Sequence, residues 1–250
     1  HADTILTANR IIKLLPAQLF TLPIKNDPRI KWAISANGET SSYNSANVHG
    51  GDTDKKVVYI PIGRPNILAT GNTTHQHVAD NTKVEVIIQN HDTSTEIERI
   101  WVEFICEPKY DGHYVAFINK WGVWDAMLFE KKDSKKMNVS AETHRRMIGA
   151  WEARSGETYT QPYSYNTREG MQARINATGQ ESITLNTGFL EEDYNEVMRQ
   201  LLQSEVFLLD NTYPVLIETV DIDYKTGVND RLIQYTITFK YAFEAINRAI

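Results

Sequence analysis

The feature that most constrains the fold is an alternation of apolar and polar residues between Arg231 and Phe243. The apolar positions are Ile233, Tyr235, Ile237, Phe239, Tyr241 and Phe243. Because successive side chains of a strand point to opposite faces, this pattern predicts a long strand with one buried face and one wet face. A second strand is expected over 215–224, and a Gly- and Asn-containing hairpin loop over 225–230 joins the two.

The stretch before these strands changes from the period of a strand to the period of a helix. Residues 182–187 alternate and predict a short strand. The apolar residues that follow have the i, i+3, i+4, i+7, i+8 spacing of one helical face: Tyr194, Val197, Met198, Leu201 and Leu202. They predict an amphipathic helix near 191–204, with Thr187 or Gly188 as its cap and the acidic residues Glu191, Glu192 and Asp193 in its first turn.

Further alternating runs predict a chain that is mainly β, with some α+β character. The expected strands are 56–62, 83–89, 97–106, 114–118, 123–129 and 135–141. Strands 114–118 and 123–129 form a tight hairpin with Trp121 near its tip and with Trp124 on the core face. Residues 142–180 have weak periodicity, so we expect irregular structure or extended strands with few core residues. The predicted fold is an antiparallel β-sandwich or barrel with the helix packed on the sheet.

The N-terminal part is richer in turns and loops. Residues 1–25 carry apolar clusters separated by Pro16 and Pro23, which predicts an extended arm, since proline interrupts a continuous helix. Polar residues dominate 26–54, where a long loop with a short strand around Trp32 is expected, and also 69–82. The chain is expected to divide near residue 95, into a loop-rich β region over 1–95 and a β-rich domain over 96–250.

Composition excludes several classes of function. The net charge is −6, from 26 Lys and Arg against 32 Asp and Glu, which argues against general nucleic-acid binding. The single cysteine, Cys106, rules out an intramolecular disulfide and is expected to pack in the core. No apolar run is long enough for a membrane-spanning helix. The chain begins at His1, which suggests a fragment, a processed product or a missing leader.

The motifs that carry chemistry each have a structural interpretation that we favour. His75 and His77 alternate like two zinc ligands but lie in a polar loop without a third ligand at a fixed spacing. The adjacent acids Glu191–Asp193 suit a helix N-terminus better than a glycosidase pair. We therefore expect no catalytic residue, metal or cofactor. The candidate interaction surface consists of Trp121, Trp32, His75 and His77.

Several segments resemble structural proteins of tailed bacteriophages that infect Bacteroidetes-type hosts. They are the hairpin Phe117–Asp125 and the segments Ile183–Gly188, Leu201–Glu205 and Leu232–Phe243. The resemblance covers roughly residues 100–250. It implies a non-enzymatic virion component of a tail, hub, neck or baseplate, which assembles as a homo-oligomeric ring and contacts other phage structural proteins.

In this interpretation the β-rich body forms the ring wall, and the arm 1–25 and the loops 35–54 and 69–82 lock subunits together. Long strands without edge protection and an apolar arm that needs a cover are compatible with it. Two alternatives remain open. One is a carbohydrate- or receptor-binding module in which Trp121 stacks on a sugar. The other is a cell-wall hydrolase that depends on an acidic residue.

Overall fold

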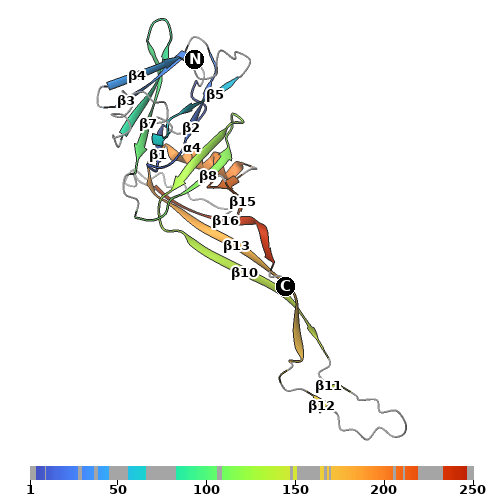
Figure 1. The fold of residues 1–250 in the computed structure, drawn as a ribbon. Coiled ribbons are helices and arrows are strands. Elements are labelled where there is room, and N and C mark those ends of the chain that lie inside the picture. Colours follow the sequence, from blue (N-terminus) through green and yellow to red (C-terminus); the bar gives the residue numbers. More distant parts are fainter. Residues whose placement is uncertain are drawn as a thin grey trace, which may run out of the picture. The chain divides into compact units, whose positions relative to one another are not determined.

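The computed structural model describes most of the 250 residues (Figure 1). The described ranges are 4–8, 10–27, 30–36, 39–44, 56–65, 83–105, 109–146, 149–150, 164–165, 168, 170–204, 207–210, 212–218 and 233–246. Within them the chain forms strands in several antiparallel sheets and the helix α4 (Tyr194–Gln203). The fold is therefore mainly β and β-sandwich-like, as the sequence predicts.

One core lies between two sheets built from the first part of the chain. A five-stranded sheet has the order β1-β7-β6-β3-β4. Its strands are β1 (Ile11–Leu14), β7 (Glu96–Phe104), β6 (Lys83–Asn90), β3 (Ile30–Ala36) and β4 (Glu39–Asn44). The second sheet pairs β2 (Thr21–Lys25) with β5 (Val57–Pro61), and side chains of both sheets meet in one apolar cluster. This is the packing of a sandwich.

Two expectations about the N-terminal part were wrong. The apolar residues of the arm do not need a neighbouring subunit to cover them, because Leu14, Leu22 and Ile24 are fully buried in the core of their own chain. The expected long loop over 26–54 contains the paired strands β3 and β4, and residues 45–55 lie outside the described ranges. The arm's apolar clusters are covered because β1 pairs with β7 and β2 pairs with β5.

A second core lies between the larger sheet and α4. The sheet has seven strands in the order β10-β13-β16-β15-β14-β8-β9. The strands are β10 (Ser134–Arg145), β13 (Gln172–Leu190), β16 (Ile233–Ile246), β15 (Tyr213–Ile217), β14 (Phe207–Leu209), β8 (His113–Ile118) and β9 (Trp124–Phe129). The alternation in β16 holds as predicted, since Ile233, Tyr235, Ile237 and Phe239 are buried.

The hydrogen bonds on the other face of β16 show that it is polar, also as predicted. Thr184 and Thr238 hydroxyls lie 3.0 Å apart across β13 and β16, and the Asn186 side-chain amide donates to the Thr236 hydroxyl over 3.0 Å. The predicted strand over 215–224 corresponds to β15, which pairs antiparallel with β16. The predicted hairpin loop at 225–230 lies outside the described residues.

The hairpin of β8 and β9 lies between the two cores. On one face, Tyr114 and Leu128 belong to the first cluster. On the other face, Val115, Phe117 and Phe129 belong to the second cluster. Both faces are therefore covered by apolar side chains, which is why these strands read as nearly continuous apolar runs instead of a simple alternation.

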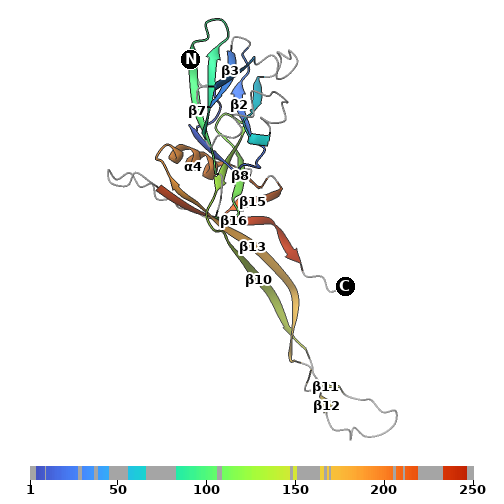
Figure 2. The ribbon, with the colours of Figure 1, turned by 60° about the vertical axis from the view of Figure 1, so that its left-hand side comes forward.

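The helix α4 packs its apolar face on the seven-stranded sheet, and both ribbon views place it beside β8 (Figures 1 and 2). The predicted cap was wrong: Asp193 precedes the first helical residue, and β13 continues through Gly188 to Leu190. Gly188 adopts a positive φ of 72°, so the change of period marks an irregularity inside a strand and not the helix start.

The contacts divide the chain into two compact units. The body comprises His1–Ser134 and Ile183–Ala242, and the ribbon comprises Lys135–Ser182 and Phe243–Ile250. The ribbon also holds the short pair β11 (Gly149–Ala150) and β12 (Ser164–Tyr165). These units do not correspond to the expected division near residue 95. That position lies in the turn between β6 and β7, and the division there stays a prediction.

Candidate functional site

The ribbon exposes the longest unpaired strand edge that the structure describes. In it β10 and the first part of β13 run side by side and antiparallel, since Arg146 N donates to Met171 O while the Ser182 hydroxyl lies near Lys136 O. Figure 2 shows the two strands alongside each other. Among the described strands, β10 pairs only with β13 and its other edge is open. An open edge of this kind can pair with another chain.

The ribbon also exposes apolar side chains. Met137 and Val139 are 49% and 52% exposed, and their spacing of two places them on one face of β10. Met171, Ile175 and Phe243 are exposed as well. Residues 142–180 therefore include an extended strand with few core residues at 172–180, one of the two outcomes expected from their weak periodicity.

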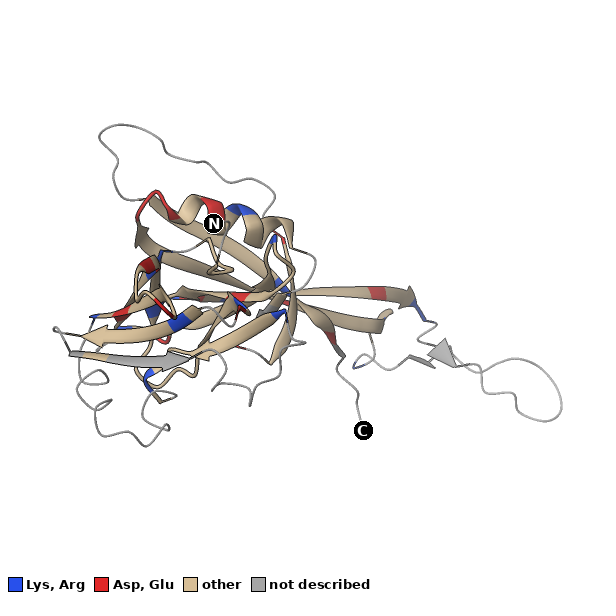
Figure 3. Cartoon of the chain, turned by 90° about the horizontal axis from the view of Figure 1, so that it is seen from above, with Lys and Arg blue, Asp and Glu red and all other residues tan. Residues whose placement is uncertain are grey.

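The two units carry opposite formal charge. The ribbon contains eight Lys and Arg against six Asp and Glu, a net charge of +2, which leaves −8 for the body. Figure 3 marks these residues on the described parts of the chain. Opposite potentials favour the encounter of two protein surfaces and suppress encounters between like-charged ones.

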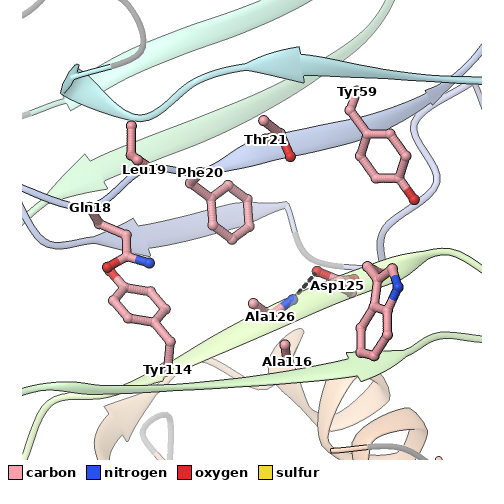
Figure 4. Close-up of a pocket in the computed structure, with 10 residues that line it drawn as sticks. Gln18, Leu19, Phe20, Thr21, Tyr59, Tyr114, Ala116, Asp125 and Ala126 are labelled. Carbon is pink, nitrogen blue, oxygen red and sulfur yellow. Dashed lines mark hydrogen bonds between the residues drawn. The ribbon is translucent and has the colours of Figure 1, made fainter. Parts of the chain in front are cut away.

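A pocket of about 340 Å³ lies within the body, between the start of β2 and β5 on one side and the β8–β9 hairpin on the other (Figure 4). Its lining residues are Gln18, Leu19, Phe20, Thr21, Tyr59, Tyr114, Ala116, Trp124, Asp125 and Ala126. Tyr59 and Trp124 are 36% and 41% exposed, whereas Phe20 and Tyr114 are buried. Four aromatic side chains thus surround an apolar space that opens to solvent.

Asp125 is the acidic residue among those that line the pocket, and it is buried. The Thr7 hydroxyl donates to Asp125 Oδ2 over 2.6 Å, and the Ala126 amide donates to Oδ1 over 2.9 Å. The Asn119 side chain donates to Oδ2 over 3.4 Å and to the Leu6 carbonyl over 2.7 Å. Removal from water raises the pKa of the Asp125 carboxyl, and these three hydrogen bonds oppose that rise.

Asn119 also shapes the tip of the hairpin. Its Oδ1 accepts hydrogen bonds from the Trp121 and Val123 amides at 3.0 and 3.4 Å. The tip is then fixed to α4, because the Lys120 amide donates to Gln200 Oε1 over 3.3 Å. One buried asparagine therefore connects the turn, the Asp125 carboxyl group and the N-terminal segment.

The predicted interaction residues do not form one surface. Trp121 lies at the hairpin tip as expected, with the Lys120 ammonium 4.4 Å from its ring centroid. Trp32 is only 3% exposed and packs in the first core, so it is no surface residue of this chain. His75, His77 and Cys106 lie outside the described residues.

The expected position of Trp124 on the core face was wrong. Trp124 is exposed at the pocket, and its neighbour Asp125 is buried in its place. Because the carboxylate finds three hydrogen-bond donors inside, the register of β9 places the acid inward and the indole outward. No local sequence pattern marks this reversal, because the donors to Asp125 include Thr7, 118 residues away.

The structure thus defines a mainly β, β-sandwich-like protein with an aromatic pocket in its body and an open-edged ribbon. Comparison with protein-family models, curated proteins and solved structures gave no match. In the described part of the chain, no group of three or more His, Cys, Asp or Glu is suited to hold a metal ion. The helices described there are also too short or too polar to cross a membrane.

Proposed function

We propose that the chain is a structural subunit of a tailed bacteriophage particle, in its tail, hub, neck or baseplate. It assembles with copies of itself into a ring and contacts other virion proteins. The resemblance of the hairpin and of the segments in β13, α4 and β16 supports the class of particle. The open-edged ribbon is the single observation that carries assembly as the function.

The ribbon has the properties of a docking element. Backbone hydrogen bonds along the free edge of β10 give affinity without requiring a particular sequence in the partner strand. The exposed side chains of Met137 and Val139 add apolar surface whose burial favours association. The ribbon takes over the role that the sequence suggested for the arm, whose apolar residues are covered by their own chain. Locking by the segment 35–54, which includes β4, and by the loop 69–82 remains part of the proposal.

The partner of the ribbon is a second copy of the same chain. Its formal charge of +2 complements the −8 of the body, so the ribbon of one copy is attracted to the body of the next. A contact between two different patches is heterologous, and heterologous contacts produce rings when the rotation between subunits closes. This supports a ring instead of an isologous dimer.

The experiment replaces the two exposed apolar residues of β10 with polar residues of similar shape, Met137→Gln and Val139→Thr. About half of each side chain is exposed. Burying this exposed half in an interface contributes about 1 kcal/mol per residue to association. The double variant is expected to associate roughly 30-fold more weakly, since 1.4 kcal/mol is a factor of ten. Analytical ultracentrifugation measures this, and electron microscopy reports the ring.

The matched control is Leu216→Gln, an exposed apolar residue of β15 in the body, which is expected to leave association unchanged. Added salt is expected to weaken the wild-type assembly, because exposed charges are screened. If the wild-type chain stays monomeric at high concentration, or if the double variant assembles as well as the wild type, the proposal is wrong.

The two alternative functions gain no specific support. Sugar stacking was expected on Trp121, but the Lys120 ammonium already covers that ring and Trp121 is not among the pocket residues. The hydrolase alternative needs an acidic residue. The acids at 191–193 were expected in the first turn of the helix but precede it, and the acid in the first turn of α4 is Glu196.

A further inference from the structure

The polar groups that the pocket in the body offers to a ligand are uncharged. None of its described lining residues is Lys, Arg or His. Asp125 is the acidic one, but side chains alternate along a strand, so its carboxyl group lies on the opposite face of β9 from Trp124 and Ala126. Both of its oxygens accept hydrogen bonds within the protein. This lining therefore favours a neutral ligand over an ionic one.

Neutral hydrogen-bonding groups lie beside the aromatic rings of the pocket. Gln18 contributes an amide, and Thr21 and Tyr59 contribute hydroxyl groups. Within the described part of the chain no hydrogen bond engages these three side chains, and Figure 4 draws one bond among the lining residues, between Asp125 and Ala126. Amide and hydroxyl groups of this kind both donate and accept, so they can pair with the hydroxyl groups of a ligand.

Two partly exposed aromatic rings come from opposite walls of the pocket. Tyr59 belongs to β5, whereas Trp124 is the first residue of β9. The pocket lies between these walls, and Figure 4 shows Tyr59 across it from the hairpin. The faces of aromatic rings carry negative partial charge and attract the weakly positive C–H groups of a sugar ring. A ring-shaped ligand between the two walls therefore meets an aromatic side chain on each side.

We propose that this pocket binds one neutral sugar ring of the β-glucopyranose type. Its two faces pack on Tyr59 and Trp124, and its hydroxyl groups pair with Gln18 and Thr21. The volume of about 340 Å³ is near the lower limit of small-molecule sites, about 300–1,000 Å³, and suits a single sugar ring. Two aromatic walls select a ring whose substituents are all equatorial, because an axial hydroxyl group would be buried against a ring without a partner.

The site differs from the sugar site that the sequence suggested at Trp121. That residue lies at the hairpin tip beside the Lys120 ammonium and does not line the pocket. The inference adds a ligand to the proposed subunit and does not replace assembly. Because the pocket belongs to the body and the strand edge proposed for assembly belongs to the ribbon, either proposal can fail without the other.

The test compares methyl β-glucopyranoside with methyl β-galactopyranoside, its epimer with one axial hydroxyl group, by isothermal titration calorimetry and by ligand-observed nuclear magnetic resonance. The glucoside is expected to bind saturably with a Kd of about 1 mM, an ordinary affinity for a ligand of this size. The galactoside is expected to bind about tenfold more weakly, because its axial hydroxyl group is left unpaired. Cyclohexanol, a ring with a single hydroxyl group, and glucosamine, a positively charged sugar, are titrated in parallel and are also expected to bind more weakly.

Two pairs of variants locate the site. Trp124→Ala is expected to weaken binding of the glucoside about tenfold, whereas Trp121→Ala, at the tip of the same hairpin but outside the pocket, leaves it unchanged. Tyr59→Ala removes the opposite wall and is expected to weaken binding by a similar factor, whereas Tyr213→Ala, at another exposed tyrosine of the body, has no effect. Circular dichroism verifies the folding of each variant, and each pair remains decisive if a variant of the other pair fails to fold.

The proposal is wrong if the glucoside shows no saturable binding up to about 50 mM, far above the millimolar range of weak sites. It is also wrong if the galactoside, cyclohexanol or glucosamine binds as tightly as the glucoside, or if a control variant weakens binding as much as its counterpart in the pocket. Loss of ring assembly without loss of glucoside binding would leave this inference intact and count only against the proposed function.

Discussion

Replacement of Thr7 by valine tests whether the N-terminal segment belongs to the body of its own chain. The Thr7 hydroxyl is buried and donates over 2.6 Å to Asp125 Oδ2, 118 residues further along the chain. Valine keeps the shape of threonine but removes this donor. Because the variant leaves a buried acceptor without its donor, the expected loss in the free energy of unfolding is about 1–3 kcal/mol.

The loss depends on pH with a defined sign. Burial raises the pKa of Asp125 above its value in the unfolded chain, so the stability linked to this group is complete in acid, below the unfolded pKa, and is lost as pH rises through the folded pKa. The Thr7 hydrogen bond favours the ionised form, and its removal raises the folded pKa further. The destabilisation by Thr7→Val is therefore expected to be larger at pH 8 than at pH 4.

Urea denaturation followed by tryptophan fluorescence measures this at both pH values. The matched control is Thr21→Val, the same chemical change at an exposed pocket residue, which is expected to alter stability by less than about 0.5 kcal/mol. In thermal unfolding, the Thr7 variant is expected to melt roughly 2–12 °C lower, at about 2–4 °C per kcal/mol for a chain of this size. Equal effects of the two variants, or a larger Thr7 effect in acid, would refute the reasoning.

Two further substitutions test the larger sheet. In urea titrations, Gly188→Ala is expected to lower the free energy of unfolding by more than Gly122→Ala. Both glycines have φ near +72°, which costs an alanine about 1–2 kcal/mol. Only at Gly188 would the added Cβ also meet another side chain, with Lys131 Cε at 2.5 Å. Equal losses would mean that Lys131 moves aside freely. Phe129→Ala is expected to cost about 3–5 kcal/mol, because Phe129 is fully buried and packs edge-to-face on Phe239, while Phe243→Ala, at an exposed ring, changes little. A loss below about 1 kcal/mol at Phe129 would contradict the core assignment.

The elements that the sequence predicts well are those whose burial is one-sided. β16 alternates because one face packs under α4 and the other meets solvent, and α4 itself has one apolar stripe, so periodicity alone locates both. The hairpin of β8 and β9 is located correctly, but its inward and outward faces are not. With apolar clusters on both sides, burial no longer follows a period of two, and Trp124 could not be told from Asp125.

The rest depends on long-range pairing that no local pattern encodes. From the sequence, the N-terminal arm looks like an apolar segment without a cover. In the structure β1 pairs with β7, whose residues lie about ninety positions further along the chain. The strands of the ribbon carry few buried side chains, so neither hydrophobic alternation nor turn chemistry marks residues 172–180 as a strand. Their pairing is held by backbone hydrogen bonds, which every sequence can make.

The β8–β9 hairpin forms one wall of the pocket and also joins the N-terminal segment to α4. Asn119 holds its tip, the Leu6 carbonyl and the Asp125 carboxylate together, and Gln200 of α4 accepts a hydrogen bond from the same turn. A buried carboxylate compensated only by neutral donors is an expensive way to join these segments, since an apolar residue would pack there without a desolvation penalty.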